Sequence, residues 1–179
     1  DLAVYYLSGA IVDPSRPLPA RMLATHAMLV LDMVPRTALI LTAILGLTLS
    51  ARMGLIPGLQ PWLGLVWGVG LAWLLMTWTV FRQEGKPLGH SLGRIDFGFR
   101  VLVVAASAWL AIDAQGAGGV VAHAPWLGFK IALLGLSIAM GLVIRLQLRP
   151  FGPLLGKVVA GTASATDEAA LQRLIAHVK

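Results

Sequence analysis

The chain has 179 residues, of which 58% are hydrophobic and 12% are charged. Soluble globular domains carry about 25% charged residues, so this composition excludes them and predicts an integral membrane protein. Cysteine is absent, which excludes disulfides, thiolate metal sites and thiol nucleophiles. The net charge of +6 comes from short segments beside apolar runs, which favours anionic lipid headgroups over nucleic acid as the partner.

The apolar runs predict an all-α, polytopic transmembrane helical bundle. The opening run "DLAVYYLSGAIV" is too short to cross a hydrocarbon core of about 30 Å, so we expect it to be the tail of a spanning helix whose beginning is missing. Four further runs are long enough to span: residues 22–53, 61–82, 95–114 and 125–146. Residues 1–149 then form the transmembrane domain.

Residues 150–179 are predicted to be a cytoplasmic tail with a short amphipathic helix. Leu171, Leu174, Ile175 and Val178 recur at helical spacing, and Ser164 or Thr166 can serve as the N-cap.

The distribution of Lys and Arg predicts the orientation in the membrane. The loops on one side hold Arg16 and Arg21, then Arg82, Lys86 and Arg94, while the opposite loops hold only Arg52. Basic loops stay on the cytoplasmic side, so the C-terminus is expected to be cytoplasmic and the location to be a bacterial inner membrane. Trp62 and Trp126 fall at the predicted outer ends of their helices, at the headgroup level.

A polar triplet occurs twice in this apolar chain. His26, Asp32 and Arg36 recur 64 residues later as His90, Asp96 and Arg100, and "PWLG" at 61–64 recurs at 125–128. This register predicts two copies of one helical hairpin, residues 22–83 and 86–147. Both copies start on the same side, so the repeat is parallel.

The Asp and Arg of each triplet lie four residues apart and can form an ion pair on one helix face. They can act as interfacial anchors near the cytoplasmic headgroups. The alternative is a haem b held between the hairpins, with His26 and His90 as axial ligands of the iron and with Arg36 and Arg100 facing the propionates.

The outer half of the predicted bundle breaks the repeat. Lys130 and Asp113 have apolar counterparts in the first copy, and they could pair as a functional site. Alternatively, Lys130 extends outward to the headgroups. His123 in the outer loop could join them or face water. Trp67, Trp73 and Trp78 are expected to face lipid or neighbouring helices.

The runs "VPRTALILTAILGLTL" and "PWLGFK" resemble the superfamily of small helical membrane proteins that contains HemJ (protoporphyrinogen oxidase) and CopD-like proteins. The resemblance covers roughly residues 22–146. It implies haem or porphyrin binding, with Lys130 matching the family's Trp-x-x-x-Lys pattern. The family's first-helix His would fall in the missing beginning of the first helix.

Three functions remain open at this point. The first is binding of b-type haem in membrane electron transfer or porphyrin oxidation. The second is a non-catalytic accessory subunit, with other membrane subunits or further copies of the chain as partners. The third is a transporter of metal or a small solute, which the parallel repeat permits, although the sequence indicates no broken helix and no ionic cluster at the midplane.

Overall fold

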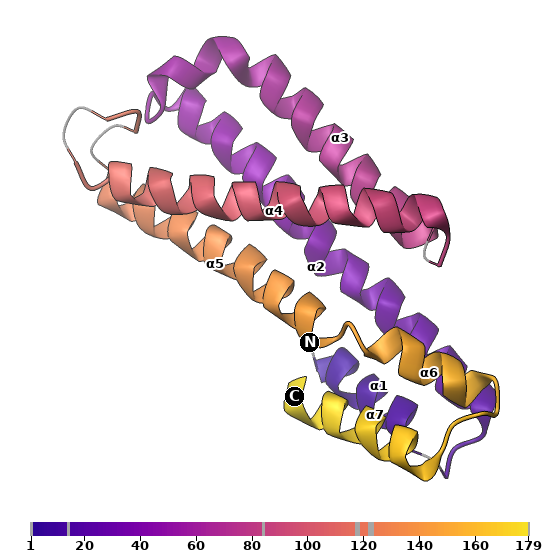
Figure 1. Ribbon diagram of the computed structural model, residues 1–179. Coiled ribbons are helices and arrows are strands. Elements are labelled where there is room, and N and C mark those ends of the chain that lie inside the picture. Colours follow the sequence, from indigo (N-terminus) through magenta and orange to yellow (C-terminus); the bar gives the residue numbers. More distant parts are fainter. Residues whose placement is uncertain (1, 14, 84, 117–118, 122–123, 179) are drawn as a thin grey trace. The chain divides into compact units, whose positions relative to one another are not determined.

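The computed structural model describes residues 2–13, 15–83, 85–116, 119–121 and 124–178, without the side chains of residues 2–5, 165, 177 and 178. Every regular element in these residues is helical (Figure 1). The elements are α1 (Leu2–Val12), α2 (Leu18–Arg52), the 3₁₀ helix η1 (Pro57–Trp62), α3 (Leu63–Arg82), α4 (Pro87–Asp113), α5 (Pro125–Gln147), α6 (Phe151–Val159) and α7 (Ala165–Val178).

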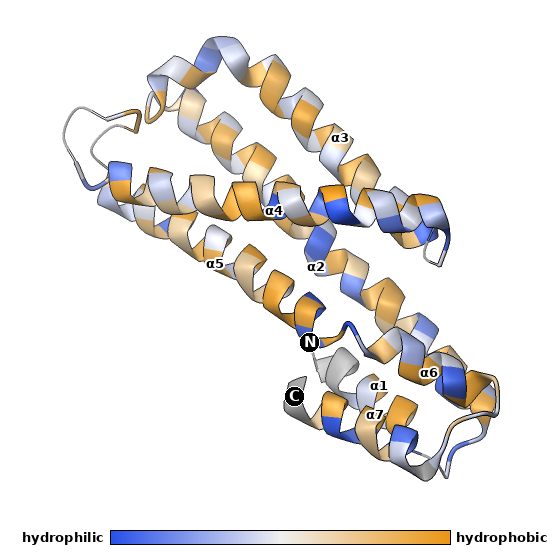
Figure 2. Ribbon diagram, in the orientation of Figure 1, coloured by the Kyte–Doolittle hydropathy of each residue, from blue (hydrophilic) through white to orange (hydrophobic). Residues whose placement is uncertain are grey.

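Among the described residues, four stretches are long and apolar enough to cross a membrane: Leu18–Arg52, Pro57–Arg82, Pro87–Asp113 and Pro125–Gln147. Apolar residues predominate along α3, α4 and α5, while α4 also carries a hydrophilic stretch (Figure 2). The predicted class, an all-α multi-pass membrane protein with four full spanning helices, is confirmed.

The start predicted for the third spanning helix is wrong. Helix α4 begins at Pro87 rather than at residue 95, and Arg94 therefore lies inside the helix instead of in a loop. Pro87 occupies the first turn, where a missing amide costs no hydrogen bond. Gly85 makes the preceding turn possible because its φ of 82° is readily adopted by glycine alone.

The chain divides into two units. Unit 2 comprises residues 37–142 and holds residues 37–52 of α2, the whole of η1, α3 and α4, and residues 125–142 of α5. Ile40 and Ile44 of α2, Trp73 of α3 and Ile138 of α5 form its central core cluster, with Phe99 of α4 packed against it. A second cluster brings together the turn after α2 and the connection between α4 and α5; its buried members are Ile56, Ala114, Val121, Ala124 and Leu127.

Unit 1 comprises residues 1–36 and 143–179. The amphipathic helix predicted in the tail is confirmed as α7, which buries Leu171 and Ile175. Ser164 caps it: the Asp167 amide donates to Ser164 Oγ at 3.2 Å, and the Ser164 amide donates to Asp167 Oδ2 at 3.1 Å. This reciprocal arrangement satisfies two backbone donors at the helix start. Helix α6 has no counterpart in the sequence prediction.

Candidate functional site

A buried ion pair lies in the middle of α4. Arg100 Nε donates to Asp96 Oδ2 at 3.0 Å and to Oδ1 at 3.1 Å. The two residues are one helical turn apart, so their side chains share a face of α4. Asp96 is 2% exposed and Arg100 is 8% exposed, and thirteen residues of α4 lie on each side of Arg100.

Helix α3 provides a matching pair of polar side chains. Trp73 Nε1 donates to Asp96 Oδ1 at 3.2 Å, and the Thr77 hydroxyl donates to the same oxygen at 3.5 Å. Arg100 Nη2 in turn donates to Thr77 Oγ1 at 3.3 Å. Trp73 and Thr77 are also four residues apart, so two one-turn pairs face each other across the hairpin. We call these four residues the α3–α4 polar cluster.

Aromatic contacts enclose the α3–α4 polar cluster on one side. The Arg100 guanidinium carbon lies 5.4 Å from the centre of the Trp73 ring, within the range of a cation–π contact. The Trp73 and Phe99 rings meet edge to face at 5.0 Å. In an apolar medium, a charged group is tolerated only when it is paired and hydrogen-bonded. The cluster meets this requirement, and it fixes α3 against α4.

The depth of this ion pair differs from the sequence prediction. A helix starting at residue 95 would place Asp96 in its first turn, at the headgroups. Because α4 starts at Pro87, Asp96 lies about 13 Å along the helix. An ionic cluster therefore occupies the middle of a membrane-length helix, where the sequence analysis expected none.

The first copy of the triplet forms the same ion pair in a different environment. Arg36 Nη2 contacts Asp32 Oδ2, and the two side chains are 41% and 40% exposed. The positions 64 residues after Trp73 and Thr77 hold Ser137 and Gly141. Ser137 has no indole at the position that corresponds to Trp73, and Gly141 has no hydroxyl at the position that corresponds to Thr77. The two triplets therefore share their ion pair but not its surroundings.

The two predicted axial ligands lie on different units. His26 is exposed on the part of α2 that belongs to unit 1, and His90 is exposed near the start of α4 in unit 2. Each lies six residues before the Asp of its triplet. Within the residues that the structure describes, no three His, Asp or Glu side chains come close enough to hold a metal ion together. His123 lies outside the described residues.

Lys130 and Asp113 have separate partners. The Lys130 Nζ atom lies 5.1 Å from the centre of the Trp126 ring, one turn earlier on α5, and Lys130 is exposed. Asp113 Oδ2 accepts the Val121 amide at 2.8 Å and so holds the connection after α4. This geometry is that of an exposed lysine beside an aromatic ring and of a carboxylate that organises a loop.

No protein-family model, curated protein or solved structure matches this chain. The interpretation of the site therefore depends on its own geometry. Sequence reasoning found Asp96 and Arg100 and expected Trp73 to face lipid or a neighbouring helix, but it did not place Trp73 or Thr77 beside the charged pair. The available signal was their spacing of four residues on the preceding helix, which equals the spacing of the charged pair.

Proposed function

We propose that this multi-pass membrane protein binds b-type haem or a related porphyrin and works in membrane electron transfer or porphyrin oxidation. The observation that carries the proposal is the shared register of the two triplets. Both Asp–Arg pairs form on their helices, and the histidine six residues before each pair is exposed. The resemblance to HemJ and CopD-like proteins supports the same function.

The proposal assigns roles to the chain's own residues. Exposed imidazoles can ligate iron, so His26 and His90 are the candidate axial ligands. Arg36 is partly exposed and can face a propionate. Arg100 is held by Asp96 and Thr77, so we assign it to fixing the hairpin that carries His90. Lys130 is the candidate that comes from the family resemblance. When bound, the haem would supply the one-electron chemistry.

A reduced-minus-oxidised absorption spectrum of the detergent-purified chain tests this proposal. We expect a b-type signal in the parent chain that is lost in His26→Ala and in His90→Ala. The matched control is His177→Ala, which lies outside both triplets and should keep the signal. A chain that carries no porphyrin and cannot be reconstituted with haem would contradict the proposal, and a signal that survives both triplet variants would remove the assigned ligands.

A second candidate function is that of a non-catalytic accessory subunit in a membrane assembly. The exposed surface of α3 favours it: a Cβ atom at Gly64 or Gly68 would meet no other atom within 4 Å. Gly-x-x-x-Gly spacing on an open helix face lets another membrane helix approach closely. Co-purification with other chains in a fixed ratio, abolished by Gly64→Leu and Gly68→Leu, is the expected result. This function also requires that replacing His26 and His90 together leaves the cofactor content of the assembly unchanged.

A further inference from the structure

An apolar cavity of about 420 Å³ lies within unit 2, beside the α3–α4 polar cluster. Elements α2, η1, α3 and α4 contribute to its wall, which includes Ile44, Trp62, Val66, Trp73, Phe99 and Val103. Every lining residue is aliphatic, aromatic or glycine. The Trp73 indole nitrogen is already used by Asp96, so its ring presents an apolar surface.

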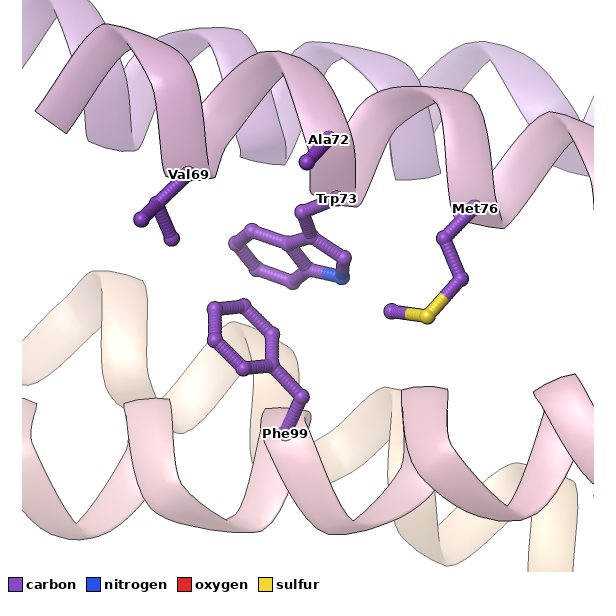
Figure 3. A pocket seen from close by; sticks show the side chains of 5 residues that line it. All are labelled: Val69, Ala72, Trp73, Met76 and Phe99. Carbon is purple, nitrogen blue, oxygen red and sulfur yellow. The ribbon is translucent and has the colours of Figure 1, made fainter. Parts of the chain in front are cut away.

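The lining residues at the end of η1 and on α3 run from Trp62 to Trp73, which is about 16 Å along the helix at 1.5 Å per residue. A smaller cavity of about 220 Å³ shares Val69, Trp73 and Phe99 and extends to Met76 (Figure 3). One leaflet of a bilayer has about 15 Å of hydrocarbon, so the row of lining residues from Trp62 to Trp73 is about as long as one leaflet is thick.

The chemistry of the wall excludes most ligands. No histidine, lysine or carboxylate lines the cavity, so it offers no ligand to iron and no partner to a propionate. The cavity is open to its surroundings, and its wall presents almost no polar surface to water or to a polar solute. A hydrocarbon chain requires no polar partner, and burying it against leucine, valine and aromatic side chains is favourable.

We propose that this cavity holds one acyl chain of a membrane phospholipid. Trp62 is 60% exposed and is predicted to lie at the outer headgroup level, where a lipid headgroup would be. The chain would run from there toward Trp73 and Phe99. This inference is independent of haem binding, because no candidate haem ligand lines the cavity.

Electron paramagnetic resonance of a phospholipid with a spin label on its acyl chain tests the inference. The full chain is reconstituted in phosphatidylcholine vesicles, and the motionally restricted lipids per chain are counted. Val103→Phe places a ring in the cavity, while Val101→Phe adds the same ring to an exposed position on the same helix. We expect one restricted lipid fewer in Val103→Phe and no change in Val101→Phe.

A second cavity variant separates filling from misfolding. Val66→Phe fills the cavity from α3, so both fillings must remove the same lipid. An unchanged count in both Val103→Phe and Val66→Phe would overturn the inference. Organic extraction of the purified protein distinguishes the source of the chain. A phospholipid retained at one per protein supports the inference, whereas an isoprenoid quinone at that ratio overturns it.

Discussion

The Trp73 indole donates a hydrogen bond to Asp96 Oδ1 at 3.2 Å and so joins α3 to the charged face of α4. The same ring packs edge to face against Phe99 and lines the apolar cavity. Tryptophan suits this position because it combines a large apolar body with one polar edge. The Trp73 side chain therefore contacts the buried ion pair and also forms part of the wall of the apolar cavity.

Replacing Asp96 with Asn should destabilise the protein strongly. The change removes the negative charge beside Arg100, which is 8% exposed, and leaves a buried cation without its counter-charge. Breaking a buried pair in this way costs about 3–5 kcal/mol. Unfolding in detergent micelles, followed by tryptophan fluorescence, measures the change in free energy.

The equivalent change in the first triplet is the matched control. Asp32 and Arg36 are about 40% exposed, so Arg36 is not enclosed by protein when its partner loses its charge. Asp32→Asn should therefore have a smaller effect than Asp96→Asn. Equal losses for the two variants would mean that burial does not distinguish the two ion pairs.

Gly128→Ala should force α4 and α5 apart. A Cβ atom at Gly128 would lie 2.8 Å from the Ala111 carbonyl oxygen and 2.9 Å from the Ala114 Cβ atom. Such overpacking costs about 1–3 kcal/mol. Gly141→Ala on the same helix meets no atom within 4 Å, and alanine should raise the free energy of unfolding there by up to about 1 kcal/mol. The unfolding temperature should therefore fall in Gly128→Ala and rise in Gly141→Ala. A shift in the same direction for both variants would contradict the close approach of α4 and α5 at Gly128.

Acid should loosen α7. Hydrogen bonds from Lys157, from the Ser164 amide and from the Ser164 hydroxyl lower the pKa of Asp167 from 3.8 to about 2. A lowered pKa means that the carboxylate stabilises the folded tail fully above pH 3.8, and that this contribution is lost as the pH falls toward 2. Pepsin cleavage within residues 160–178 should rise across this window in the parent chain. Asp167→Asn should be cleaved readily at all pH values in this window. If cleavage of Asp167→Asn rose with falling pH as it does in the parent chain, the effect would not come from Asp167.

Glu168→Gln should release α7 from α2. Arg21 Nη1 contacts Glu168 Oε1 at 3.1 Å, and the Arg21 side chain is 6% exposed. Its Nε donates to the Ile11 carbonyl at 2.7 Å, so Arg21 remains buried when its charged partner is removed. If the free energy that holds α7 in place falls by about 1–2 kcal/mol, the fraction of molecules with α7 released rises by a factor of about 5–30. Trypsin cleavage after Arg173 should rise by that factor.

The control for the Arg21–Glu168 ion pair is an exposed ion pair in the same unit. Asp13→Asn breaks the contact with Arg16, whose side chain is 55% exposed. Cleavage after Arg173 should stay at the parent rate in this variant. An equal rise in both variants would show that any lost charge in unit 1 loosens the tail.

Much of the fold could be predicted because hydropathy and capping are local. The four spanning segments follow from the length of the apolar runs, and the cap of α7 follows from Ser164 and the amphipathic pattern after it. The start of α4 could not be predicted in this way. His90, Ser91 and Arg94 are polar residues typical of a loop, although a helix can carry them where it emerges from the hydrocarbon core.

The environment of each ion pair could not be predicted from the sequence either. Spacing predicts that Asp96 and Arg100 pair, and equally that Asp32 and Arg36 do. Which pair is buried depends on how each helix is rotated, and packing sets that rotation. Helix α6 was missed because its Pro153, Gly152 and Gly156 are poor helix formers, and its packing against α7 is a tertiary effect.

The contact between Arg21 and Glu168 spans 147 residues of chain. At about 5–20 residues per second, a ribosome needs roughly 7 to 30 s to make that length. During this time, Arg21 has left the ribosome and its partner does not yet exist. The contact between Arg21 and Glu168 therefore forms only after the four long helices have been synthesised. A chain interrupted before Glu168 would leave Arg21, at the start of α2, without its carboxylate partner.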